Sequence, residues 1–246
     1  MNKSAIVFHI PHSSMHLPPE YLSGVVLTDE ELRGEMLWAT DMYCDELFDT
    51  GYGVPVVAEF SRFACDAERF RNDEEEPNAA AGQGFFYTHT MRGIFFRQAN
   101  SALKEKAALE LYDPHHAQLE AAVQAALNEN PRCLIIDGHS FCDDDLIGAN
   151  LPDFCIGSDP FHTPEALVND MAAFLRDKAY RVAVNYPFAG ALVPQKWYRK
   201  DVRVLSIMVE INKRLYLEND MITKRADFVG IKNLCADMIA TITKNL

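Results

Sequence analysis

Two histidines in this sequence stand where an imidazole could bind a catalytic metal ion. His12 follows Pro11 at the end of an apolar run, and His139 follows Gly138 at the end of another. The proline restricts the backbone beside one ring, and the glycine allows a close backbone approach beside the other. Two imidazoles and one carboxylate, with a fourth position open, are the usual ligands of a hydrolytic zinc ion. We therefore expect His12 and His139 to bind a metal.

The carboxylate ligand of such a site is expected to be Asp41. A helical pattern covers residues 28–50, and on it Asp41 shares a stripe with Leu37 and Phe48. A carboxylate among apolar neighbours needs a partner or a metal ion. Asp45, about one helical turn further on, is the alternative ligand. Zinc is the expected ion, and manganese or cobalt would accept the same ligands.

Glu210 is the candidate catalytic base, because it lies inside an apolar segment where an unpaired carboxylate is costly. A divalent metal lowers the pKa of a water molecule and polarises a carbonyl group. A nearby carboxylate can then move a proton from that water to a leaving amine. The expected reaction is hydrolysis of an amide, with His116 as a second candidate catalytic group. A serine hydrolase is disfavoured, since residues 138–142 contain only half of a nucleophile elbow.

Arg62 and Arg69 follow a predicted strand and are candidates for binding the substrate. A guanidinium group matches the geometry of a carboxylate and can bind it through two hydrogen bonds. The pair therefore predicts a small-molecule substrate that carries a carboxylate. The alternative is that both arginines are solvated surface charges.

The elements that must position these residues follow from the hydrophobic pattern. Short apolar runs predict strands at residues 4–10, 55–60, 133–136, 153–156, 180–185 and 202–211. Helical patterns and their start signals predict helices at residues 28–50, 99–111, 113–128, 163–178 and 226–243. Strands that are apolar throughout are typical of a mostly parallel or mixed sheet covered by helices on both faces. The predicted fold class is therefore α/β.

The candidate residues cluster where the predicted strands end. In open α/β sheets, ligands bind beyond the carboxyl ends of the strands. His12, His139 and Asn185 follow predicted strands, and Glu210 lies near the end of one. No segment rich in proline, glycine or serine divides the chain, so we expect a single catalytic domain over residues 1–246.

The composition excludes several classes of protein. The chain has 246 residues, of which 48% are hydrophobic and 24% charged, as in ordinary globular proteins. Its net charge of −13 argues against binding to nucleic acid, which requires a basic face. No apolar run reaches the ~18 residues of a membrane span, and no signal peptide is recognisable. The six cysteines form no Cys-x-x-Cys pair, and we expect a cytoplasmic enzyme with reduced thiols.

Several short motifs, taken together and in order, resemble those of the N-formylglutamate amidohydrolase (N-formylglutamate deformylase) family. They lie at residues 9–14, 40–41, 61–62, 66–69, 114–116, 137–141, 185–190 and 210–216. The resemblance implies a fold similar to that of zinc carboxypeptidases. It also implies hydrolysis of N-formylglutamate to formate and glutamate, a late step of histidine catabolism.

The resemblance also carries roles onto individual residues of this sequence. It implies metal binding by His12, Asp41 and His139, catalysis by Glu210 and His116, and substrate binding by Arg62, Arg69, Asn185 and Arg214.

The sequence departs from the family pattern at Glu68, at residues 113–115 and at Ala191. These departures lie on the expected substrate side. They leave open a zinc carboxypeptidase, or a deacylase of another N-acyl amino acid. A metal- or ligand-binding protein without turnover is the non-enzymatic alternative.

Overall fold

The structure, a computed structural model, describes residues 2–143 and 151–244. The chain forms two compact units. The first consists of Met1–Ile10, Tyr43–Val57 and Leu119–Leu246, and the second consists of Pro11–Met42 and Ala58–Gln118. The expectation of one catalytic domain stays a prediction.

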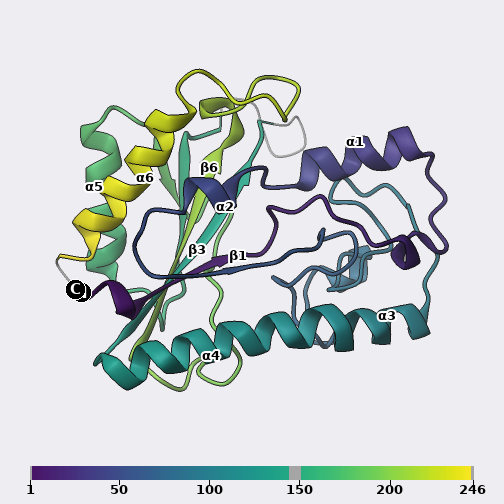
Figure 1. Ribbon diagram of the computed structural model, residues 1–246, viewed down its shortest axis with the longest axis horizontal. Coiled ribbons are helices and arrows are strands. Elements are labelled where there is room, and N and C mark those ends of the chain that lie inside the picture. Colours follow the sequence, from purple (N-terminus) through teal and green to yellow (C-terminus); the bar gives the residue numbers. More distant parts are fainter. Residues whose placement is uncertain (1, 144–150, 245–246) are drawn as a thin grey trace. The chain divides into compact units, whose positions relative to one another are not determined.

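The first unit contains a six-stranded sheet in the order β2-β1-β3-β6-β4-β5. Its strands are β1 (Ile6–Ile10), β2 (Val54–Val57), β3 (Cys133–Phe141), β4 (Phe154–Gly157), β5 (Val182–Val184) and β6 (Val204–Asn212). Three neighbouring strands, β1, β3 and β6, are labelled in Figure 1. β4 runs antiparallel to β6, and every other neighbouring pair is parallel. β1, β3, β4 and β6 are buried along their whole length, as their apolar sequences require. The predicted mixed sheet of an α/β fold is confirmed; the likeness to zinc carboxypeptidases stays a prediction.

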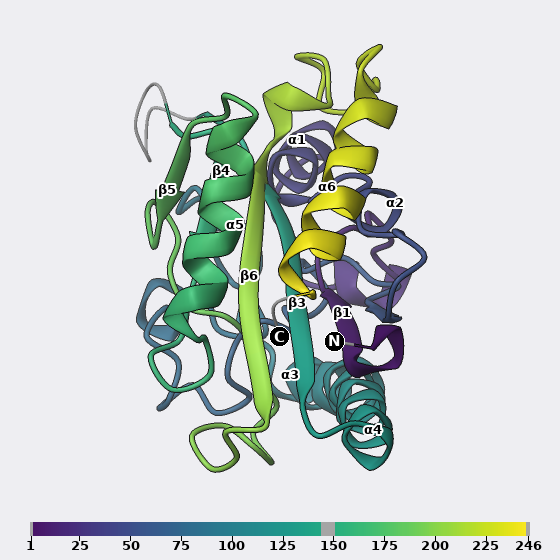
Figure 2. The same cartoon turned by 90° about the vertical axis from the view of Figure 1, so that its left-hand side faces the viewer.

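Helices cover both faces of this sheet. α5 (Glu165–Asp177) and α6 (Phe228–Ile242) lie over one face (Figure 2). On the other face, Val7, Ile135 and Val204 share an apolar cluster with Leu119, Val123 and Ala126. The last three residues belong to α4 (Asp113–Glu129). Within the described residues, no helix combines the length and hydrophobicity that membrane crossing demands.

The second unit is largely irregular and is organised around a buried arginine. Arg97 is fully buried and donates hydrogen bonds to the carbonyl groups of Tyr21, Phe63 and Tyr87. Its guanidinium group also stacks 3.7 Å from the ring centre of Phe86. Buried backbone carbonyls need donors, and this one side chain supplies them to three separate segments.

The remaining helical segments are short. α1 (Asp29–Ala39) begins with a capping box formed by Thr28 and Glu31, as its sequence predicts. The others are α2 (Cys44–Leu47), α3 (Ser101–Ala107), η1 (Lys3–Ala5), η2 (Pro19–Leu22), η3 (Ala79–Ala81), η4 (Ala108–Tyr112) and η5 (Lys213–Leu215).

The helix predicted at residues 28–50 is wrong in its second half. α1 ends at Ala39, where the Thr40 hydroxyl donates a hydrogen bond to the Met36 carbonyl at 2.7 Å. Tyr43 then adopts a left-handed backbone with φ 64° before the chain turns into α2. Asp41 therefore lies in a turn and not on a helical stripe.

The two helices predicted at residues 99–111 and 113–128 are joined. α3 continues through the π-helical segment η4 directly into α4. Asp113 is therefore not an N-cap. A wider π turn precedes Pro114, which has no N–H to complete an α-helical hydrogen bond to residue 110.

Several strand ends also differ from the prediction. β2 ends at Val57 and β5 begins only at Val182. β3 continues beyond residue 136 to Phe141, because it pairs with β6 along its whole length. His139 therefore lies inside a strand, and its side-chain direction is set by the sheet.

Replacing Gly138 with alanine tests the packing of β3. A Cβ atom at Gly138 would lie 2.6 Å from Cδ1 of Ile10 and 2.7 Å from Cδ2 of Phe48. We expect the free energy of unfolding to fall by about 1–3 kcal/mol in denaturant titrations, because an overpacked core must shift. Gly34→Ala is the control. It adds a Cβ atom to α1 with nothing within 4 Å, and should raise stability by about 0.5–1 kcal/mol. A Gly138→Ala variant with the same free energy of unfolding as the wild type would contradict this account.

Candidate metal centre

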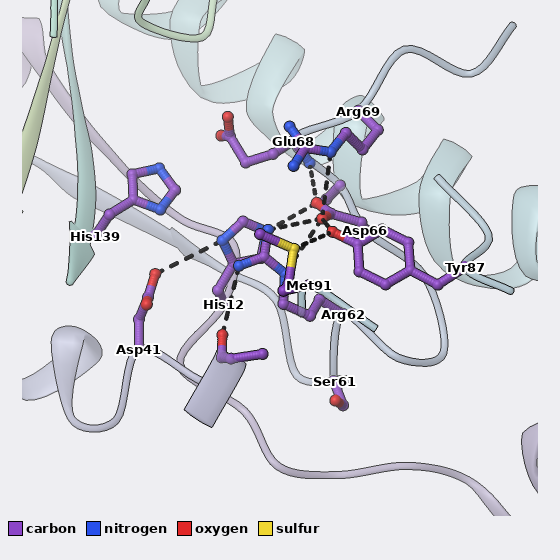
Figure 3. A network of polar contacts seen from close by, with 12 residues as sticks. His12, Asp41, Ser61, Arg62, Asp66, Glu68, Arg69, Tyr87, Met91 and His139 are labelled. Carbon is purple, nitrogen blue, oxygen red and sulfur yellow. Dashed lines mark hydrogen bonds and ion pairs between the residues drawn. The ribbon is translucent and has the colours of Figure 1, made fainter. Parts of the chain in front are cut away.

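The second unit brings His12 and Asp41 together. The Asp41 backbone N–H donates to the His12 carbonyl at 2.9 Å, which ties the turn after α1 to the segment after β1. This places Nδ1 of His12 3.6 Å from Oδ2 of Asp41 (Figure 3). Both side chains are buried. An imidazole and a carboxylate buried side by side are two of the three ligands expected of a zinc site.

Asp66 lies on the other side of the His12 ring. Its Oδ1 atom is 2.8 Å from Nε2 of His12 and accepts the Glu68 backbone N–H at 2.9 Å. Its Oδ2 atom accepts hydrogen bonds from Arg62, at 2.8 Å, and from the Tyr87 hydroxyl. Figure 3 shows this network. Burial alone would raise the pKa of Asp66, but the neighbouring Arg62 and His12 hold that pKa well below its usual range.

The two predicted substrate arginines differ in their surroundings. Arg62 is buried and directs Nε and Nη2 to Asp66 and Nη1 to the Ala39 carbonyl. Burial would lower the pKa of Arg62, but the negative charge of Asp66 raises it above its ordinary value. Arg69 contacts Asp66 only at 3.8 Å, and 20% of its side chain is exposed. Arg69 is therefore the arginine with the greater reach toward a solvent-borne ligand.

The first unit places His139 in a second buried network. Oδ1 of Asp137 is 3.1 Å from Nε2 of His139 and 2.8 Å from Nδ1 of His9. Oδ2 of Asp137 accepts the Leu192 backbone N–H at 3.0 Å. Burial opposes ionisation of Asp137, but His139 and His9 lower its pKa below the ordinary range. Asp137 is thus a buried charged group that is hydrogen-bonded to His9 and lies at ion-pair distance from His139.

Glu210 belongs to β6, the strand that pairs with both β3 and β4. It pairs with His139 of β3 on one side and with Cys155 of β4 on the other. Because side chains alternate along strands, the three project from the same face of the sheet. Glu210 is buried. Burial, with a smaller contribution from Glu210, raises the pKa of the Cys155 thiol to about 11. The thiol is thus held protonated beside the carboxylate.

The other predicted site residues have local partners. His116 lies 2.9 Å from the Ala67 carbonyl and stacks on Tyr112. Asn185 bonds twice to Ser158.

Arg214 forms ion pairs with Asp143 at 2.6 Å and Asp153 at 2.5 Å. Asp45, the alternative ligand, is exposed on α2. His12 and Asp41 are therefore brought together within the second unit, as His139 and Glu210 are within the first.

Sequence analysis missed Asp66, Tyr87, Asp137 and His9 as parts of these networks. The sequence contains a signal that could have identified Asp66, because arginines lie four residues before it and three residues after it. Asp137 had one too, as an acid at the end of an apolar run. Tyr87 had none, since it lies in an irregular segment without periodicity.

The chain is similar to one known family and to solved structures. The family model described as N-formylglutamate amidohydrolase matches residues 4–217. A crystal structure of N-formylglutamate amidohydrolase from Ralstonia eutropha JMP134 is 24% identical, with a TM-score of 0.84 over 98% of this chain and 93% of that chain. A gene product from Agrobacterium tumefaciens is 18% identical, with a TM-score of 0.71 over 99% of this chain and 94% of that chain. No curated protein matches in sequence.

Tyr87→Phe tests how strongly the second unit depends on the Asp66 network. The hydroxyl donates to a buried, charged carboxylate, so its loss should lower the free energy of unfolding by about 1.5–3 kcal/mol. Tyr112→Phe is the matched control, because that hydroxyl donates to the neutral Arg69 carbonyl at 2.8 Å. Its loss should cost about 0.5–1.5 kcal/mol in the same denaturant titration. Equal losses would show that the charge on Asp66 is unimportant.

Proposed function

Because the chain belongs to the N-formylglutamate amidohydrolase family, we propose that it hydrolyses N-formylglutamate, or a related small N-acyl acidic amino acid, with the help of a divalent metal ion. The products are formate and glutamate. The observation that carries the proposal is the family match over residues 4–217, which includes each of the residues to which a role is given.

We propose that His12, Asp41 and His139 bind the metal, with Zn²⁺ as the expected ion. The donor types fit, because imidazole nitrogens and a carboxylate oxygen are common zinc ligands. The buried pair of His12 and Asp41 supports two of the three assignments. His139, which is buried in β3, is the third proposed ligand. A zinc ion bound there would act as a Lewis acid toward the formyl group and make water more acidic.

Glu210 is the proposed base. Its carboxylate takes one proton from the water that attacks the formyl carbon, and the resulting carboxylic acid gives that proton to the amine nitrogen. The C–N bond then breaks, and the second proton of the water passes from the formic acid to the amine, so that the products are formate and the ammonium form of glutamate. The place of Glu210 beside His139 in the sheet supports this role. His116 is proposed as an auxiliary catalytic group.

Substrate binding is proposed for four polar side chains. Arg69 is the principal candidate for binding the substrate carboxylate, since its side chain keeps an exposed portion. Arg62, Asn185 and Arg214 remain proposed contacts, although each has internal partners in this structure. Binding energy of this kind positions the amide for attack.

A panel of N-acyl amino acids tests the proposal. Formyl, acetyl and succinyl derivatives of glutamate, aspartate and glutamine would be supplied to protein of measured zinc content. We expect N-formylglutamate to give the highest kcat/KM. Faster cleavage of another acyl group would favour the deacylase alternative. Retained zinc with no cleavage of any compound would favour a binding protein without turnover.

Glu210→Gln separates the base from the metal ligands. The amide cannot accept a proton, so kcat should fall by about 10² to 10⁴. Zinc content, measured by elemental analysis after dialysis, should remain that of the wild type. Loss of zinc would instead make Glu210 a ligand and exclude it as the base.

Arg69→Ala tests substrate recognition. We expect KM for N-formylglutamate to rise at least about 10-fold, because a charge-assisted hydrogen bond to the substrate is lost. Arg71→Ala is the control. Arg71 is two residues away and pairs with Asp113 on the surface, so its loss should leave KM unchanged. If Arg69→Ala and Arg71→Ala had the same KM, Arg69 would be a surface charge that does not bind the substrate.

A further inference from the structure

The contacts of His12 identify which of its ring nitrogens carries the hydrogen. Oδ1 of Asp66 lies 2.8 Å from Nε2. A carboxylate is a hydrogen-bond acceptor, and Asp66 also accepts from Arg62, Tyr87 and the Glu68 N–H. The ring therefore donates to Asp66 through Nε2. The lone pair of the neutral ring lies on Nδ1, which is the nitrogen 3.6 Å from Asp41.

His139 also lies beside a buried carboxylate, in the first unit. Oδ1 of Asp137 lies 3.1 Å from Nε2 of His139. Asp137 is fully buried, and its second oxygen accepts the Leu192 backbone N–H. The ion-pair contact turns Nε2 of His139 toward Oδ1 of the carboxylate, whereas the hydrogen bond to the same Oδ1 atom comes from the His9 ring.

We propose that Asp66 is a positioning residue, which turns His12 so that its ring binds the metal through Nδ1. The inference rests on the proposed function, in which His12 is a ligand. A carboxylate behind a ligating histidine fixes the tautomer and the direction of the ring and makes the ligand more basic. Asp66 does not touch the substrate in this proposal.

The surroundings of Asp66 suit this role. Its Oδ1 atom contacts His12 and the Glu68 N–H, and its Oδ2 atom contacts Arg62 and Tyr87. Donors on both oxygens prevent the carboxylate from rotating away from the ring. Arg62 also supplies the opposite charge that a buried carboxylate needs. Arg62 thereby influences metal binding indirectly, because it holds Asp66 against the His12 ring.

Asp66→Asn tests the inference by metal affinity. Zinc dissociation constants would be measured on the purified full chain by competition with a chromophoric chelator. We expect binding to weaken by about 10- to 100-fold. Glu35→Gln is the matched control, because Glu35 is likewise a buried carboxylate of the second unit, paired with Arg92. Its zinc affinity should equal that of the wild type. Circular dichroism of the metal-free proteins checks that both variants fold.

The wild-type protein provides a second readout, independent of the variants. Nitrogen-15 spectra of the zinc-loaded protein, with the His12 signals assigned by their loss in His12→Gln, report which nitrogen is protonated. We expect a protonated Nε2 and a metal-bound Nδ1. Coordination through Nε2 would overturn the inference even if Asp66→Asn did not fold.

The outcomes separate the inference from the proposed function. If the wild type cleaves N-formylglutamate but Asp66→Asn binds zinc as tightly as Glu35→Gln, the inference is wrong and the function stands. If the wild type binds zinc through Nδ1 and Asp66→Asn weakens that binding, while no N-acyl amino acid is cleaved, the inference stands and the function is wrong. If the wild type binds neither zinc, manganese nor cobalt and cleaves no N-acyl amino acid, both are wrong.

Discussion

The second unit depends on a carboxylate that water cannot reach. Burying an ionised acid is costly unless charge and hydrogen bonds replace its hydration. Asp66 obtains both, from Arg62, Tyr87, His12 and a backbone N–H. Each donor comes from a segment with little regular structure of its own. The same contacts that stabilise the charge therefore hold the irregular backbone in place and set the orientation of one imidazole.

The first unit positions its polar groups by a different means, the register of a sheet. His9 lies beside Asp137, and His139 lies beside Glu210. Strand pairing fixes which side chains share a face, so four polar residues from three strands project to the same side without a loop to orient them. Toward the amino-terminal ends of β1, β3 and β6, that face carries Val7, Ile135 and Val204, which pack against α4. One face of the sheet thus combines an apolar half with a polar half.

The features that depend on local pattern were predictable from the sequence. The apolar runs located all six strands, and the capping box located the start of α1. The end of α1 was not predictable, because Leu37, Asp41 and Cys44 keep helical spacing through a turn that Thr40 and Tyr43 create. The polar half of β3 was also hidden. Asp137 and His139 resemble loop residues in sequence, and only pairing with β6 makes them part of a strand.

The networks around the candidate ligands needed tertiary information. The motif at residues 61–69 drew attention to its arginines, whose charge suggests a ligand. Asp66 lies between the two arginines in the sequence and forms an ion pair with Arg62. This pairing arises only when the segment is buried. Tyr87 joins from a stretch without any periodic signal. Spacing can therefore identify candidate ligands but not the side chains that hold them.

Mounting His139 and Glu210 on paired strands has an evolutionary consequence. A central strand tolerates few insertions, because a one-residue slip turns its side chains to the opposite face. The irregular segment that carries Arg69 has no such restriction, and loops vary more readily than the elements they join. Descendants of this fold can thus diverge in the molecules they accept by remodelling that segment, while the residues assigned to bond cleavage are inherited unchanged.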